Sequence, residues 1–137
     1  MTKRITSTLS LILLLFLMGG MNLSFKKYDC SSFKTGKYVV KNEKFDTYII
    51  RKDNYQIEYS SDNKLKLKSK ITWTSDCEYY ISDYKILENP NNMDVSQILQ
   101  GEKIYFTILK TKKNYIITEA VMKKYNFKTE IKYDRVK

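Results

Sequence analysis

Two cysteines, a set of carboxylates and a group of aromatic residues are the parts of this sequence whose types could do chemistry. Cys30 and Cys77 are its only cysteines, and none of its 137 residues is histidine. The absence of histidine excludes serine–histidine triads, histidine metal sites and histidine proton shuttles. Two thiols do not complete the four-ligand shell that zinc requires. We therefore expect no metal and no cofactor.

The carboxylates do not form an evident acid and base pair. Asp76, Glu78 and Asp83 lie around one expected strand, and Glu119 stands between apolar residues of another. Strand alternation places Glu78 on the solvent face, whereas Glu119 could point inward with its pKa raised by burial. One such carboxylate is not a catalytic site, so we expect no catalytic residue and no enzyme activity.

The two cysteines are interpreted as a disulfide. Cys30 and Cys77 are an even pair, and the chain is expected to leave the reducing cytosol. A bridge over so long a loop is expected to stabilise the domain by roughly 4 kcal/mol. Because little else is expected to hold the segment before residue 36, reduction should free residues 21–34 while the rest persists. A free or an acylated Cys30 remains the alternative.

The aromatic residues suggest a binding site. Tyr55, Tyr59, Trp73 and Tyr79 alternate with polar residues in expected strands. If they face inward, their apolar rings with polar tips suit a cavity for a small amphipathic ligand. The alternatives are that strand propensity alone explains these rings, or that a small barrel is filled by its own side chains.

The basic charge favours a solvated surface over a nucleic-acid interface. The chain has 25 basic and 15 acidic residues, a net charge of +10, but only Arg4, Arg51 and Arg135 are arginine. Nucleic-acid-binding proteins rely on arginine for bidentate contacts to phosphates and bases, whereas scattered lysine protects exposed strand edges from pairing. A basic barrel that binds single-stranded nucleic acid remains the alternative function.

These residues lie on expected strands. In the clearest one, Lys64 to Thr74, Leu65, Leu67, Ile71 and Trp73 share one face and the lysines take the other. This period of two is typical of a half-buried antiparallel strand. The same pattern, broken by short turns, predicts about eight strands in all, over Gly36 to Val40, Phe45 to Lys52, Asn54 to Ser60, Lys64 to Thr74, Cys77 to Glu88, Glu102 to Thr111, Asn114 to Lys123 and Tyr125 to Arg135.

One segment departs from this pattern. Pro90 interrupts the strands, and the apolar residues within 93–100 have helical spacing, with Asp94 or Ser96 as possible caps. We expect a short helix there, which either plugs the barrel or covers a cavity as a lid.

The first residues have the layout of a secretory leader. Lys3 and Arg4 precede a long uncharged run that is rich in leucine and is interrupted at Gly19 and Gly20. We expect residues 1–20 to be a cleaved signal peptide that forms a helix, and residues 21–137 to be one domain in the periplasm or outside the cell. Alternatively, an uncleaved leader anchors the protein in the inner membrane, its only expected contact with a membrane.

Two stretches carry a resemblance. Residues 30–37 (CSSFKTGK) and 71–79 (ITWTSDCEY) resemble a group of short exported proteins from flavobacteria and related Bacteroidetes, some of which are labelled DNA topoisomerase IV. Their motifs imply no known chemistry. The architecture also resembles a small lipocalin. The glycine-x-tryptophan opening of lipocalins is absent, because Gly36 is followed by Lys37 and Tyr38 and the tryptophan lies at position 73.

Taken together, these patterns predict an all-β fold, an up-and-down antiparallel meander that closes into a small lipocalin-like barrel, because short connections pair successive strands and closure removes exposed edges. We expect an exported, non-enzymatic monomer that binds a small amphipathic ligand or a partner in the cell envelope.

Overall fold

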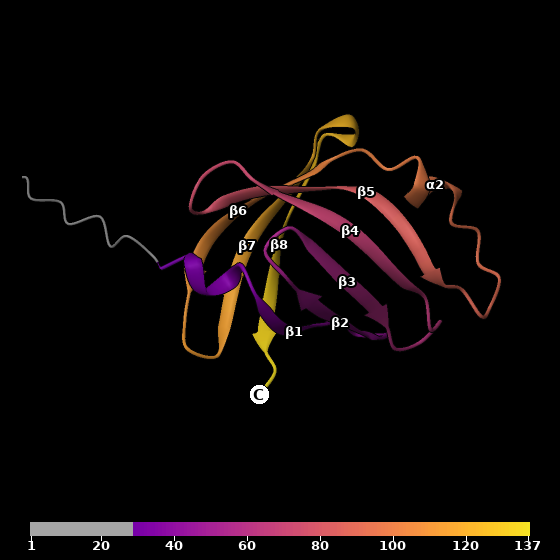
Figure 1. Cartoon of the computed structure of the whole chain (residues 1–137), viewed down its shortest axis with the longest axis horizontal. Helices are drawn as coiled ribbons and strands as arrows, with labels where there is room; N and C mark the ends of the chain where they lie inside the picture. The colour runs from indigo at the N-terminus through magenta and orange to yellow at the C-terminus, as the bar shows by residue number, and fades with distance from the viewer. Residues whose placement is uncertain (1–28) are drawn as a thin grey trace, which may run out of the picture.

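The structure is a computed structural model that describes residues 29–137, and it is a barrel of antiparallel strands (Figure 1). The predicted leader, its cleavage and its alternative as an anchor lie outside the described residues. No helix in the described part of the chain is long and apolar enough to cross a membrane. The elements, in chain order, are η1 (Ser31–Phe33), β1 (Gly36–Lys41), β2 (Asp46–Arg51), β3 (Tyr55–Ser60), β4 (Lys66–Trp73), β5 (Glu78–Glu88), α2 (Ser96–Leu99), β6 (Ile104–Thr111), β7 (Tyr115–Met122), η2 (Lys123–Tyr125) and β8 (Phe127–Arg135).

The strand order confirms the predicted meander. Each strand pairs with the next in sequence, and the barrel closes where β1 pairs with β8 through Tyr38 opposite Arg135 and Val39 opposite Asp134. The eight predicted strand ranges agree with the observed ones to within two residues at each end. Short polar turns limit successive strands to hairpin pairing, which explains this agreement.

The alternation predicted for residues 64–74 is also confirmed. Leu65, Leu67 and Ile71 are buried, and Ser69 shares their face with an exposed fraction of 1%. The lysines between them lie on the outer face. The barrel interior therefore receives one side chain in two from this strand, as a half-buried strand requires.

A bulge in β5 changes which side chains enter the barrel. Tyr79 and Ile81 are buried, and a regular strand would next turn residue 83 inward. Instead, Asp83 has a φ of 53°, and the β4 pairing advances by two residues while β5 advances by three. The extra residue turns Tyr84 toward the interior, where it lines the cavity described below.

The two ends of the barrel differ. η1 lies across one end, and α2 lies at the other (Figure 1). Phe33 of η1 is fully buried and packs edge-on against the rings of Tyr38 and Tyr133, with ring centres 4.9 and 5.1 Å away. By contrast, α2 buries no residue, and Leu99 is 55% exposed. The plug of this barrel is thus η1. The short helix predicted within residues 93–100, as a plug or a lid, is present as α2, but it buries no residue and does not plug the barrel.

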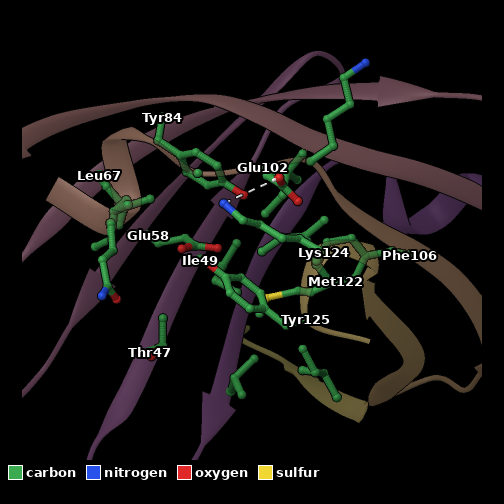
Figure 2. Close-up of a pocket in the computed structure, with 18 of the residues that line it drawn as sticks. Thr47, Ile49, Glu58, Leu67, Tyr84, Glu102, Phe106, Met122, Lys124 and Tyr125 are labelled. Atoms are coloured by element: carbon green, nitrogen blue, oxygen red, sulfur yellow. Dashed lines mark ion pairs between the residues drawn. The ribbon is translucent and has the colours of Figure 1, made fainter. Parts of the chain in front are cut away.

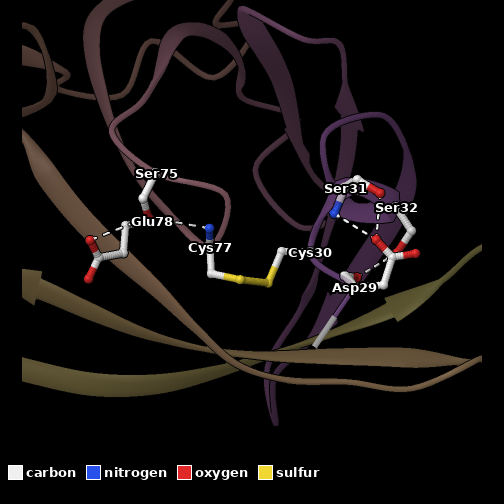
Figure 3. The surroundings of a disulfide bond; sticks show 7 residues. All are labelled: Asp29, Cys30, Ser31, Ser32, Ser75, Cys77 and Glu78. Atoms are coloured by element: carbon white, nitrogen blue, oxygen red, sulfur yellow. Dashed lines mark hydrogen bonds between the residues drawn. A yellow bond between two sulfur atoms is a disulfide. The ribbon is translucent and has the colours of Figure 1, made fainter. Parts of the chain in front are cut away.

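The predicted disulfide is present and fastens η1 to the barrel. Cys30 and Cys77 are bonded, with their Cα atoms 5.3 Å apart, just before β5 begins. Figure 3 shows that Asp29 and Ser75 flank the bridge. The Asp29 carboxylate accepts the Ser31 N–H at 3.1 Å, and the Ser75 hydroxyl oxygen accepts the Cys77 N–H at 3.4 Å. Local hydrogen bonds therefore orient both ends of the bridge.

The expectation that little besides the bridge holds this segment is wrong. Phe33 is buried among the aromatic residues of the barrel end, and Arg135 of β8 donates to the Ser32 hydroxyl at 2.9 Å. The buried ring of Phe33 fills the closed end of the barrel and gives η1 packing contacts that do not depend on the disulfide. We therefore expect η1 to remain docked when the disulfide is reduced.

Candidate functional site

The open half of the barrel contains a cavity of about 550 Å³. This volume lies within the range of sites that bind small organic molecules. Its walls include residues from all eight strands, and residues of α2 and η2 complete the lining (Figure 2). Most of the wall is apolar, formed by Val40, Ile49, Leu67, Ile81, Ile104, Phe106, Met122 and Ile131.

A chain of polar side chains runs from the cavity into the closed end of the barrel. Glu58 lines the cavity, and the Gln56 amide donates to its carboxylate at 2.6 Å. The oxygen of the same amide accepts two hydrogen bonds from Arg51, at 2.8 and 3.2 Å. Arg51 also donates to the Tyr79 hydroxyl at 3.2 Å. Gln56 thus connects a buried guanidinium to a carboxylate, with each of its two ends oriented by one of the charges.

Aromatic rings enclose the guanidinium of Arg51, whose side chain is 1% exposed. Its central carbon lies 3.9 Å from the ring centre of Phe33, 4.8 Å from that of Tyr79 and 5.5 Å from that of Tyr133. The negative faces of aromatic rings attract a cation, and this attraction is stronger away from water. Arg51 is therefore held by the protein itself and is sealed from the cavity by Gln56.

Glu58 is half-buried, and part of its surface faces the cavity. Burial raises the pKa of its carboxyl group, because an ionised carboxylate loses hydration there. The charge of Arg51 and the hydrogen bond from Gln56 act in the opposite direction but do not outweigh burial. The carboxylate is consequently only partly compensated by its neighbours.

Tyr84 contributes a second polar group with unused hydrogen-bonding capacity. Its hydroxyl oxygen is buried and has no hydrogen-bond partner among residues 29–137. Burial raises its pKa strongly, and the negative charge of Glu58 raises it further, which places the two groups within electrostatic reach. In Figure 2 both side chains project into the same space from different strands. An unpaired buried hydroxyl is costly, so this position is suited to a ligand that supplies the missing hydrogen bond.

The mouth is built by the segment after β5 and by the β7–β8 turn. Gln97 and Ile98 of α2 line one side, and Lys124 and Tyr125 of η2 line the other. Lys124 pairs with Glu102 at 3.7 Å, an ion pair drawn in Figure 2. Tyr125 is 66% exposed, so its ring stands at the rim.

Gly101 is required where α2 meets Tyr84. A Cβ atom at this position would lie 2.5 Å from the Ile98 carbonyl oxygen and 2.9 Å from the Tyr84 ring, closer than atoms can pack. Glycine therefore lets the chain pass directly over the tyrosine. This contact holds the mouth segment against the wall that presents the Tyr84 hydroxyl.

The four aromatic residues predicted to line a cavity do not line it. Tyr79 is buried in the closed end, stacked on Phe106 at 4.8 Å and next to Trp73 at 4.7 Å. Tyr55 and Tyr59 lie on the outer face of β3, where lysine amino groups cover their rings. The inward face of β3 is the opposite one, which carries Gln56 and Glu58. The polar face turns inward because Arg51 on the neighbouring strand provides it with a buried partner.

Glu119 is a further correction. Its neighbours Thr118 and Ala120 are buried inside the barrel, so Glu119 lies on the outer face. There it forms an ion pair with Lys128 of β8 at 3.0 Å. The inward carboxylate of this protein is Glu58, which the period of two placed on the outer face because it alternates with the more apolar Ile57 and Tyr59.

No family model, curated protein or solved structure matches the chain. The resemblance to short exported proteins of flavobacteria stays a prediction, and the cavity itself carries the functional argument. Within residues 29–137 no group of side chains is arranged to hold a metal ion.

Proposed function

We propose that this protein is an exported, non-enzymatic binding protein that holds a small amphipathic ligand inside its barrel. The observation that carries the proposal is the cavity of about 550 Å³, with mostly apolar walls and the polar groups of Glu58 and Tyr84 in its lining. Apolar walls favour the apolar part of a ligand, and a few placed polar groups orient it. The disulfide between Cys30 and Cys77 supports export, because such bonds persist in oxidising compartments.

The outer surface argues against the nucleic-acid alternative. Strand tyrosines could serve as stacking platforms for bases only if their faces were free. Instead, the amino groups of Lys68, Lys123 and Lys103 lie 4.0 to 4.6 Å from tyrosine ring centres. Lysine and tyrosine therefore satisfy one another on this surface, which leaves the cavity as the better-supported site.

Blocking the cavity tests the proposal. Ile49 lines the cavity, whereas the next residue, Ile50, is 42% exposed on the outer face. Ile49→Trp fills part of the interior, so we expect it to weaken binding of the neutral apolar dye N-phenyl-1-naphthylamine by at least about tenfold, or about 1.4 kcal/mol. Ile50→Trp adds the same ring outside and should bind the dye as the wild type does. Fluorescence titration of the dye measures both affinities.

Circular dichroism provides the folding control for these variants. Thr47→Trp supplies a second interior block on the same face of β2 and closer to the mouth, in case the ring at position 49 disturbs packing. Wild-type protein that does not bind the dye, or dye binding that survives both interior substitutions, would show that the cavity is not a binding site.

A further inference from the structure

The Glu58 carboxylate lines the cavity, and its charge bears on which charged end of an amphipathic ligand can fit there. Within residues 29–137, none of the ion pairs includes Glu58, and its carboxylate is hydrogen-bonded to the neutral amide of Gln56. Arg51 is separated from it by that amide and directs its donors to Gln56, Tyr79 and the Phe33 carbonyl. The cavity lining therefore includes a carboxylate without a cation in direct contact. A ligand with a positive end would supply that cation.

Other groups that line the cavity are also suited to an ammonium group. The Tyr84 hydroxyl oxygen has no partner among the described residues and offers lone pairs as a hydrogen-bond acceptor. Tyr133 and Phe106 present aromatic rings to the same cavity, and ring faces attract cations. A primary ammonium has three N–H donors, so it matches a carboxylate, a phenolic oxygen and a ring face at once.

An anionic end would meet unfavourable surroundings beside Glu58. It would approach the Glu58 carboxylate, while the nearest lysines lie at the mouth. Of these, Lys124 pairs with Glu102 at 3.7 Å, and Lys103 lies 4.6 Å from the Tyr80 ring centre. The basic residues of the mouth therefore have partners already.

We infer that the ligand is an amphipathic amine, which enters with its ammonium group toward Glu58 and Tyr84 and leaves its apolar part against the walls. This inference rests on the proposed function and names the class of ligand for the same cavity. It also predicts that ligand charge, and not only hydrophobicity, determines affinity.

Binding of such an amine should depend on pH. The groups that interact electrostatically with Glu58 are Arg51 from β2, Tyr79 and Tyr84 from β5 and Tyr133 from β8. Burial raises the pKa of all three phenols, so they stay neutral at physiological pH. Glu58 binds a cation only when ionised, and burial raises its pKa. Amine affinity should therefore fall as the pH is lowered through the pKa of Glu58, whereas affinity for a neutral ligand should not.

Three probes that share a ten-carbon alkyl chain and differ in their polar end group test the inference. Decylamine, decanol and decanoate compete for bound N-phenyl-1-naphthylamine at pH 7.5, each below its aggregation limit. A charge-assisted hydrogen bond at Glu58 should make decylamine about tenfold tighter than either of the others. Glu58→Gln keeps the side-chain size and an acceptor for Gln56. It should reduce the affinity for decylamine to that for decanol. Glu119→Gln removes a carboxylate from the outer face and should leave the order unchanged.

The possible outcomes separate the inference from the proposed function. If the dye binds but the three probes displace it equally, or if the preference for decylamine persists in Glu58→Gln, the amine assignment is wrong and the binding site stands. If the dye does not bind at all, the proposed function itself fails. Should Glu58→Gln not fold, the wild-type pH series decides: a decylamine affinity that is as pH-independent as that of decanol would overturn the inference.

Discussion

Arg51→Met is expected to lower the free energy of unfolding by about 3 to 5 kcal/mol, the typical cost of removing one partner of a buried charged network. The substitution keeps an unbranched chain in the aromatic enclosure but removes the guanidinium. Gln56 then loses the donors to its oxygen, Tyr79 loses its hydrogen bond, and Glu58 loses the charge that favours its ionised form. Urea denaturation followed by the fluorescence of Trp73, the single tryptophan, measures the change.

Two further variants separate the network from the mere loss of a cation. Arg135→Met removes the other arginine of the closed end, which is only half-buried and bonds to Ser32, so its cost should stay below about 1.5 kcal/mol. Combining Arg51→Met with Gln56→Leu and Glu58→Leu replaces the whole network by apolar groups and should recover much of the lost stability. A loss below about 1 kcal/mol for Arg51→Met, or no recovery in the triple variant, would contradict this account of the barrel interior.

Breaking the disulfide is the second change with a large expected effect. Cys30 and Cys77 are 47 positions apart, and the chain-entropy model gives about 4 kcal/mol for a loop of this length. Measured losses are usually smaller, so Cys77→Ser should lower the free energy of unfolding by about 2 to 4 kcal/mol. Denaturation of the variant, and of the wild type with and without reductant, measures this difference.

The reduced protein should nevertheless keep η1 in place. Phe33 is fully buried and contacts Arg51 as well as the rings of the closed end, so the plug has interactions of its own. Limited proteolysis should therefore leave the chain uncut around residues 31–34 after reduction. Rapid cleavage there would show that the disulfide alone holds η1, and two alkylatable thiols in native protein purified from its host would show that the bridge does not form.

The strand order and bounds could be predicted because they depend on local signals. Apolar and polar residues alternate, short turns of serine, asparagine and aspartate separate the runs, and hairpin connections leave little choice of pairing. The disulfide was predictable for a similar reason, since Cys30 and Cys77 have no alternative partner in the sequence. These features do not require knowledge of what each side chain meets across the barrel.

The cavity could not be predicted in this way, because its residues are placed by distant contacts. In β3 the period of two predicts that the face with Tyr55 and Tyr59 turns inward, but the face with Gln56 does so, because Gln56 bonds to Arg51 of the neighbouring strand inside the barrel. In β5 the bulge at Asp83 reverses the alternation, so Tyr84 enters the barrel at a position where the period of two would place it outside. In both strands, which side chains face inward depends on pairing with another strand.

The location of a bound ligand decides whether the barrel interior is the binding site. Nuclear Overhauser contacts between decylamine and the isoleucine methyl groups of the protein report which side of the barrel the probe occupies. We predict contacts to Ile49 and Ile81, which line the cavity, and none to Ile50 on the outer face. Contacts confined to Ile50 or other outer residues, or the absence of any contact at saturating decylamine, would contradict the assignment of the barrel interior as the binding site.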